Sequence, residues 1–260
     1  MWRWARGRWA SVRGGPALPL VLIALLAVAG CGGSAGVGAI SPPRPKPSPS
    51  VAPPVVYVAI GASDAVGVGA DDPNTQGYVP LLIARLPAHS QALNLGINGN
   101  VIHGALSNEL PQAIAAHPTL VTVWMVGNDF RGCTPLDAFS ADLETLLEQL
   151  RTQTHARVFV ANLPDMSQLP FFQDGAPQAG ACLQGKSVAQ VRAQVMAWNA
   201  VIAAAVARHG DVLVDLFNSD LAAHPNLIYR DGFHPSTAGY QVLADLFWAQ
   251  IQAHGGVPKS

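Results

Sequence analysis

Two distant segments of the chain carry the side chains needed to attack an ester. Ser63 stands in the sequence Gly-Ala-Ser-Asp, and near the other end Asp231 precedes His234 by three residues. A serine hydroxyl becomes a nucleophile when a base takes its proton, and imidazole is a base suited to neutral pH. A nearby carboxylate fixes the tautomer of the imidazole and stabilises the imidazolium. We therefore predict that Ser63 is a nucleophile, that His234 is its base and that Asp231 orients His234.

Two further segments, rich in glycine and asparagine, lie between them at residues 94–99 and 127–129. In chain order, the four segments supply a serine, a glycine, an asparagine and a histidine, with the aspartate before the histidine. This order and spacing resemble the SGNH (GDSL-type) hydrolase family, and the resemblance extends over residues 55–260. It implies a serine esterase that works through an acyl-enzyme intermediate. It implies no metal or other cofactor.

The resemblance also implies an oxyanion hole, the set of hydrogen-bond donors that stabilises the charged tetrahedral intermediate. Its members here are the backbone N–H groups of Ser63 and Gly99 and the side-chain amide of Asn128, with Gly96 as the competing glycine. The chain departs from the family pattern at Ala62, where an aspartate is usual. That aspartate is not the acid of the triad, so the departure concerns the local turn more than the chemistry.

Each of these residues also has an ordinary structural interpretation. Ser63 would suit a helix N-cap, and Asn128 and Asp231 would suit turns or caps. His103 follows the second segment and is a weaker candidate for lining the pocket. Three large residues within the apolar runs are expected in the core, not at a binding surface: Tyr57, Trp124 and Met125.

The elements that must position these residues are short apolar runs. They are apolar at nearly every position, which is typical of strands buried on both faces of a parallel sheet. They occupy residues 55–61, 92–97, 120–126, 157–162 and 212–217.

Helical patterns alternate with these runs. Residues 134–137 (Thr-Pro-Leu-Asp) predict a helix start with the threonine as cap and the proline as first residue. Further helices are expected over residues 187–209, stopped by Gly210, and over residues 236–254. The chain is thus predicted to form an α/β fold, a three-layer αβα sandwich with a flavodoxin-like, doubly wound, parallel five-stranded sheet. In such folds ligands bind at the carboxyl ends of the strands, where all four segments lie.

The residues between the fourth strand and the next helix, 163–186, show no clear periodicity. Long loops of this kind often act as lids or binding loops. Phe171 and Phe172 either offer an apolar wall to an acyl or aryl group or pack beneath the loop. Cys182 lies in this loop and Cys133 follows the third strand. If these strands are neighbours, as the resemblance implies, a Cys133–Cys182 disulfide would hold the loop beside the site.

The N-terminus has the pattern of an export signal. Residues 1–30 combine early arginines with an apolar run too short to span a bilayer comfortably. The run ends in Val-Ala-Gly-Cys, which resembles the bacterial lipobox, so Cys31 is expected to be lipidated; an ordinary signal peptide cut elsewhere is the alternative. Residues 31–54 are rich in proline and serine, as in a semi-rigid linker. We expect an extracytoplasmic lipoprotein of the cell envelope, anchored to the membrane, with its hydrolase domain at 55–260.

Composition excludes several other classes of protein. With 50% hydrophobic and 12% charged residues, the chain is not intrinsically disordered as a whole. From Val55 onward it has 9 basic and 16 acidic residues, so it lacks the basic surface of a nucleic-acid binder. The expected partner is an ester substrate, whether acyl, aryl or an acetylated glycan. An O-acetyltransferase acting on envelope polysaccharide and a non-catalytic surface binding module stay open as alternatives.

Overall fold

The computed structural model describes residues 53–257. The predicted signal peptide (1–30), the lipidation site Cys31 and most of the predicted linker (31–54) lie outside the described residues. Within residues 53–257, no helix is both long enough and apolar enough to cross a membrane.

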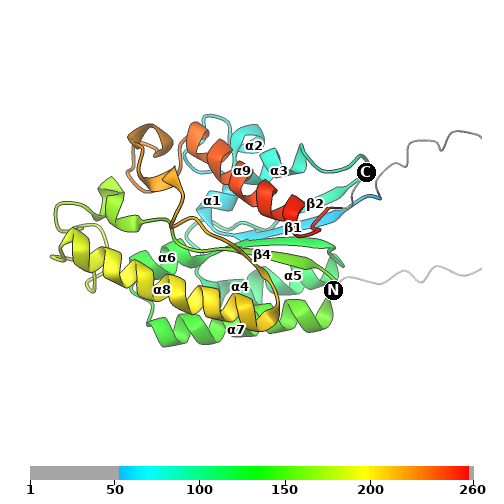
Figure 1. The fold of residues 1–260 in the computed structure, drawn as a ribbon, viewed down its shortest axis with the longest axis horizontal. Coiled ribbons are helices and arrows are strands. Elements are labelled where there is room, and N and C mark those ends of the chain that lie inside the picture. Colours follow the sequence, from blue (N-terminus) through cyan, green and yellow to red (C-terminus); the bar gives the residue numbers. More distant parts are fainter. Residues whose placement is uncertain (1–52, 258–260) are drawn as a thin grey trace, which may run out of the picture. The chain divides into compact units, whose positions relative to one another are not determined.

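A five-stranded parallel sheet forms the centre of the described part, in the order β2-β1-β3-β4-β5 (Figure 1). Every neighbouring pair runs parallel, which confirms the predicted fold class. The strands are β1 (Val56–Gly61), β2 (Gln91–Asn94), β3 (Leu120–Trp124), β4 (Arg157–Ala161) and β5 (Val212–Val214).

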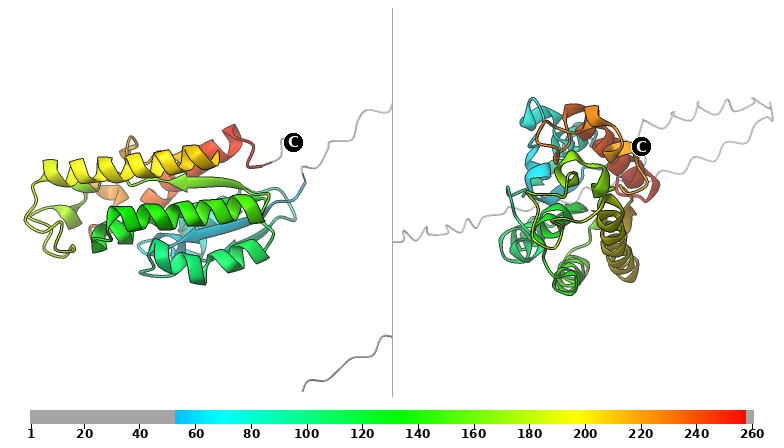
Figure 2. Two further views of the ribbon diagram at one scale, coloured as in Figure 1. Left: turned by 90° about the horizontal axis from the view of Figure 1, so that it is seen from below. Right: turned by 90° about the vertical axis from the view of Figure 1, so that its left-hand side faces the viewer.

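Helices cover both faces of this sheet (Figures 1 and 2). On one side lie α1 (Ser63–Val66), α2 (Pro73–Gln76), α3 (Tyr78–Ile83) and α9 (Thr237–Ala253). On the other lie α4 (Ile102–Asn108), α5 (Leu110–Ala115), α6 (Val126–Gly132), α7 (Leu136–Gln153) and α8 (Val188–His209). Short 3-10 helices lie within the loops: η1 (Met166–Gln168), η2 (Pro170–Phe172), η3 (Asp220–Ala222) and η4 (Pro225–Leu227).

Local capping signals explain most of the helix boundaries. α8 begins after Ser187, which forms a capping box with Gln190, and ends at Gly210 in the left-handed conformation. α9 begins after Ser236, whose hydroxyl accepts the N–H of Gly239 at 3.2 Å. Both helices therefore have the predicted bounds to within one or two residues.

α7 begins one residue later than expected. Thr134 is not its cap, because the Thr134 N–H donates to the backbone oxygen of Asp129 at 3.0 Å and so completes the turn that ends α6. Pro135, with φ −56° and ψ 133°, takes the cap position instead. Proline has no backbone N–H, so the start of the helix has one donor fewer that would lack a partner within the helix.

β2 also differs from the sequence expectation. We expected every apolar run to be buried, but all four residues of β2 are exposed, since it is an edge strand that pairs only with β1. The regular strand stops at Asn94, earlier than the apolar run. Beyond it, the N–H of Leu95 donates to Ala59 and that of Ile97 to Gly61, at 2.9 and 3.1 Å. The chain therefore continues alongside β1 as far as the end of that strand.

Candidate active site

Ser63 lies in the first turn after β1 and is 6% exposed. It is the first residue of α1, so the N-cap position falls to Ala62 and not to the serine. The backbone oxygen of Ala62 accepts the N–H groups of Ala65 and Val66 at 3.1 and 3.2 Å. The Ala62 methyl group is buried, so the turn is held by backbone hydrogen bonds without the aspartate that is usual in the family.

Ser63, His234 and Asp231 form a continuous hydrogen-bonded chain although the serine and the histidine are 171 residues apart. Ser63 Oγ is 2.8 Å from His234 Nε2, and His234 Nδ1 is 2.6 Å from Asp231 Oδ2. When the imidazole proton is on Nδ1, it is donated to the carboxylate, and Nε2 is free to accept the serine hydroxyl hydrogen. The arrangement can therefore move a proton away from Ser63 as its oxygen attacks.

The Asp231 carboxylate also shapes the loop that carries the histidine. Its Oδ1 accepts the backbone N–H groups of Phe233 and His234 at 2.9 and 3.0 Å. Partial burial opposes ionisation of this carboxyl, but the hydrogen bonds from His234 and from the two N–H groups outweigh it and hold the pKa of Asp231 below its usual range. Asp231 is therefore anionic at neutral pH, as an orienting carboxylate must be.

The segment after α1 fixes the histidine loop against the serine. A Cβ on Gly69 would lie 2.4 Å from the backbone oxygen of Pro235, so only glycine lets the two segments approach this closely. The Tyr240 hydroxyl donates to the Val68 oxygen at 2.6 Å, and the Asp71 N–H donates to Thr237 Oγ1 at 2.9 Å. The start of α9 is thereby tied to the segment that follows Ser63.

Gly99 and Asn128, the other two predicted members of the oxyanion hole, lie at the same edge of the sheet as Ser63. Gly99 has φ +73°, and a Cβ there would meet no atom within 4 Å, so its side is open. At Gly96 a Cβ would lie 2.7 Å from that of Ala65, which makes Gly96 a packing glycine. Asn128, in the first turn of α6, is 8% exposed and uses Nδ2 to donate to the Asn100 oxygen at 2.9 Å. The second hydrogen of that amide remains available to a ligand.

A buried glutamate links these parts of the site, and the sequence analysis did not single it out. Glu109 Oε2 accepts the Gly61 N–H at 2.9 Å, while Oε1 accepts Asn100 Nδ2 at 2.6 Å. Burial raises the pKa of Glu109 to about 7, although both hydrogen bonds favour the ionised form. One sequence signal could have marked it, since it is the only acidic residue between Asp72 and Asp129.

Comparisons with known proteins show the family and the fold. The model of the GDSL-like Lipase/Acylhydrolase family matches residues 59–242, a span that includes Ser63, Gly99, Asn128, Asp231 and His234. The chain belongs to the GDSL-like lipase/acylhydrolase family. No curated protein matches by sequence.

Solved structures share the fold of this GDSL-like protein at low sequence identity. TesA is similar with a TM-score of 0.60 and 23% identity, over 76% of this chain and 98% of TesA. The esterase EstA from Pseudoalteromonas sp., in a structure inhibited by monoethylphosphonate, has a TM-score of 0.56 and 18% identity, over 76% of this chain and 97% of EstA. The acetylxylan esterase Axe2 from Geobacillus stearothermophilus has a TM-score of 0.58 and 18% identity, over 77% of this chain and 95% of Axe2.

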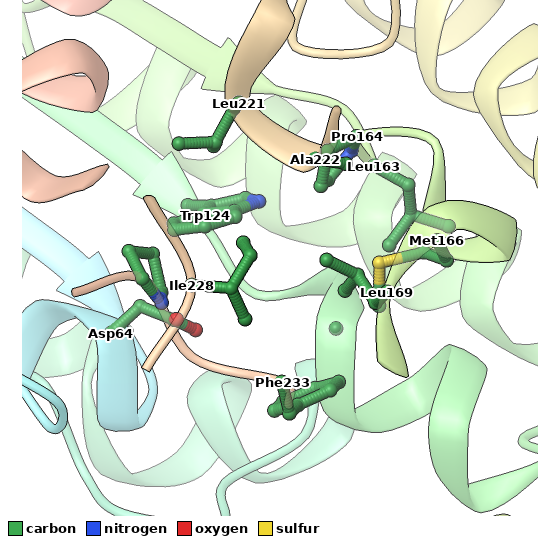
Figure 3. Close-up of a pocket in the computed structure, with 12 residues that line it drawn as sticks. Asp64, Trp124, Leu163, Pro164, Met166, Leu169, Leu221, Ala222, Ile228 and Phe233 are labelled. Carbon is green, nitrogen blue, oxygen red and sulfur yellow. The ribbon is translucent and has the colours of Figure 1, made fainter. Parts of the chain in front are cut away.

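A largely apolar pocket adjoins the triad of this GDSL-like protein (Figure 3). The space inside it that a water-sized group can occupy is about 20 Å³, and the empty space reaches about 380 Å³ only when its opening to solvent is counted. Four lining residues are immediate neighbours of site residues in the chain: Asp64, Gly127, Phe233 and Pro235. The rest of its wall is formed by Trp124, Leu163, Pro164, Met166, Leu169, Leu221, Ala222 and Ile228.

The two polar side chains of this pocket were not recognised from the sequence. Trp124 belongs to the core, as expected, and is only 6% exposed, but it also lines the pocket, which the sequence did not indicate. Asp64 was noted only as the residue after the serine. Burial raises the pKa of Asp64 to about 6, against the opposing attraction of His234.

The loop over residues 163–186 contributes to the rim of the site. The predicted disulfide between Cys133 and Cys182 is present and joins this loop to the end of α6. Phe172 is buried beneath the loop, whereas the Phe171 ring lies 5.3 Å from that of Phe233. The guanidinium of Arg131 stacks over both of these last rings, at 5.6 and 5.2 Å from their centres. Phe172 therefore packs beneath the loop, as one of the two expectations had it. Phe171 packs against the core and is not part of the pocket wall, so its role as a wall for an acyl or aryl group stays a prediction.

His103 does not belong to the site. Its side chain is 82% exposed and pairs with Asp142, 3.1 Å away. The histidine lies on α4, where the residues that face the sheet are the buried Ile102 and Ala105. The place of His103 in the chain, just after the second segment, therefore did not indicate a place in the pocket. Helical periodicity turns its side chain toward solvent.

Proposed function

We propose that this protein is a serine esterase that hydrolyses carboxylic esters through an acyl-enzyme intermediate. The observation that carries the proposal is the 2.8 Å contact between Ser63 Oγ and His234 Nε2, with Asp231 holding the other imidazole nitrogen. Membership in the GDSL-like family supports an acylhydrolase. Two of the similar proteins are an esterase and an acetylxylan esterase, so we choose simple carboxylic esters and acetylated glycans as the substrates to test.

In the first half of the reaction, Ser63 Oγ bonds to the ester carbonyl carbon while His234 Nε2 takes the hydroxyl proton. The carbonyl oxygen becomes an oxyanion, to which the N–H groups of Ser63 and Gly99 and the Asn128 amide donate. Collapse of this intermediate breaks the bond to the alcohol, which receives the proton from Nε2. In the second half, water repeats the same steps on the acyl-serine and releases the acid.

The test compares the full-length protein with its Ser63→Ala variant on p-nitrophenyl acetate. We expect turnover by the parent and a loss of about 10⁴–10⁶-fold, to the buffer background, in the variant. A p-nitrophenyl alkylphosphonate should inactivate the parent and add its mass to the peptide that contains Ser63. A parent protein that neither releases p-nitrophenol above background nor accepts the phosphonate would contradict the proposal and favour a non-catalytic binding module.

The same assay separates hydrolysis from acyl transfer. With a soluble glycan added as acceptor, an esterase releases acetate in proportion to p-nitrophenol. Acetate that appears on the glycan in preference to water would assign the protein as an O-acetyltransferase that uses the same triad.

A further inference from the structure

The pocket beside the triad contains a carboxylate, that of Asp64, whose hydrogen bond from the protein comes from its own backbone N–H. Asp64 directly follows Ser63, and Figure 3 shows its carboxyl group pointing into the pocket near Ile228. Among residues 53–257, no other residue donates a hydrogen bond to this carboxyl group. Its neighbours along the wall are mostly hydrocarbon, such as Leu169 and Phe233.

A carboxylate in such surroundings favours a ligand that carries a hydrogen-bond donor. Burial of an acceptor without a partner costs free energy, and a ligand that supplies the donor removes that cost. Arg131 does not fill this role, since it stacks on Phe171 and Phe233 and forms no ion pair with Asp64 in the described part of the chain.

Trp124 provides the complementary group in the same pocket. Its indole Nε1 is buried and has no acceptor among the described residues, although buried polar atoms are nearly always paired. The pocket therefore offers an acceptor to which no other described residue donates and a buried donor without an acceptor among the described residues. A hydroxyl group can donate to Asp64 or accept from Trp124, whereas an ammonium would serve only Asp64, and a carboxylate would be repelled by it.

We propose that this pocket binds a hydroxylated, otherwise apolar group of the ester substrate, and that Asp64 determines this specificity. The proposal rests on the esterase function proposed above and names the substrate class of that site. The shared chemistry is a hydroxyl close to the ester bond, since Asp64 is adjacent to the nucleophile. The hydroxyl belongs either to the acyl group or to the alcohol, and the experiment has one arm for each.

The acyl arm compares kcat/KM for p-nitrophenyl 3-hydroxybutyrate and p-nitrophenyl butyrate, which share a leaving group. The alcohol arm compares acetate release from 3-hydroxybutyl acetate and butyl acetate, which share an acyl group. In at least one arm, the parent should prefer the hydroxylated ester by about 10-fold or more, because a hydrogen bond to a charged group in a largely apolar pocket discriminates strongly.

Substitutions at Asp64 should change this preference more than they change the reaction. Asp64→Leu should lower the ratio of the two kcat/KM values by about 10–100-fold. Asp64→Asn keeps an acceptor oxygen and should retain most of the ratio. Trp124→Phe keeps a ring and loses only the N–H, so it should lower the ratio several-fold. Asp137→Leu, which removes an exposed carboxylate from α7, is the matched control and should leave the ratio unchanged.

The ratio of the two kcat/KM values compares two esters on the same variant. An Asp64 variant with a disturbed nucleophile therefore still reports on specificity. Phosphonate labelling of Ser63 shows which variants keep a competent site. Hydrolysis without preference in either arm, with the same ratio in Asp64→Leu as in the parent, would overturn this inference and leave the esterase proposal standing. Failure of the parent on all four esters, together with no phosphonate labelling, would overturn both.

Discussion

A single carboxylate, that of Asp231, both shapes a loop and orients the imidazole. Oδ1 accepts two consecutive backbone N–H groups, which closes the turn, and Oδ2 lies 2.6 Å from His234 Nδ1. Because the two oxygens have separate partners, substitution can remove one function and keep the other. This makes Asp231 a more informative position than the serine for testing how the imidazole is oriented.

Asp231→Asn should lower kcat by about 10³–10⁴-fold while the protein remains folded. The amide oxygen can still accept the two N–H groups, but the NH₂ group cannot accept a hydrogen from Nδ1, so the imidazole takes the wrong tautomer. Steady-state kinetics and thermal unfolding measure the two effects separately.

Asp215→Asn is the matched control for that substitution. Asp215 also uses Oδ1 to accept the N–H groups of Phe217 and Asn218, at 3.0 and 3.4 Å, but it has no histidine partner. A similar loss of kcat in both variants would mean that Asp231 acts only through the shape of its loop.

At the scale of elements, the end of β1, the start of α5 and the loop before α4 meet at Glu109. This residue immediately precedes α5 and accepts the N–H at the end of β1. It also accepts Asn100 Nδ2, and the Asn100 oxygen in turn accepts the Asn128 amide. The end of β1 and the loop before α4 are therefore joined directly by the buried Glu109 side chain, and α6 is joined to them through Asn100.

We expect Glu109→Gln to lower kcat about 10-fold with little change in KM. The amide offers only one acceptor oxygen for two donors, so either Gly61 or Asn100 loses its partner. If Glu109 acts by positioning Asn128, the double variant with Asn128→Ala should be no slower than Asn128→Ala alone.

Two observations keep this second prediction specific. Glu148→Gln alters an exposed glutamate on α7 and should leave kcat unchanged. Losses of kcat that multiply in the double variant would show that Glu109 does not act through Asn128.

At the scale of the whole molecule, several buried carboxyls make stability depend on pH. Burial raises the pKa of Glu109 to about 7 and those of Asp64, Asp129 and Asp211 to about 6. Between the ordinary carboxyl values near pH 4 and these raised values, the folded state binds more protons than the unfolded state. Stability contributed by these groups is present below about pH 4 and is lost as the pH rises through 6 and 7.

The midpoint of thermal unfolding should therefore fall by at least about 3 °C between pH 5 and pH 8. Carboxyls with lowered pKa, such as Asp231, act in the opposite direction but only at more acidic pH. Scanning calorimetry at constant ionic strength measures the change. Asp211→Asn should reduce the slope, and a midpoint that rises steadily from pH 5 to pH 8 would contradict the prediction.

The sequence alone determined the features that depend on local interactions. Ser187 and Gly210 bound α8 correctly because a cap and a left-handed stop act within a few residues. The apolar runs located all five strands, and the spacing of Asp231 and His234 marked a pair that meets within one turn. These signals persist in any fold that contains the segment.

The contacts between side chains from distant segments became known from the three-dimensional fold. From the sequence, Glu109 is an ordinary helix residue, and only the structure shows that Gly61 and Asn100 donate hydrogen bonds to it. Trp124 is recognisable as a core residue, and only the structure shows that it also lines the pocket. The exposure of β2 follows from its place at the edge of the sheet, which strand order sets. Such contacts join residues far apart in the chain, so they cannot be predicted from the local sequence pattern.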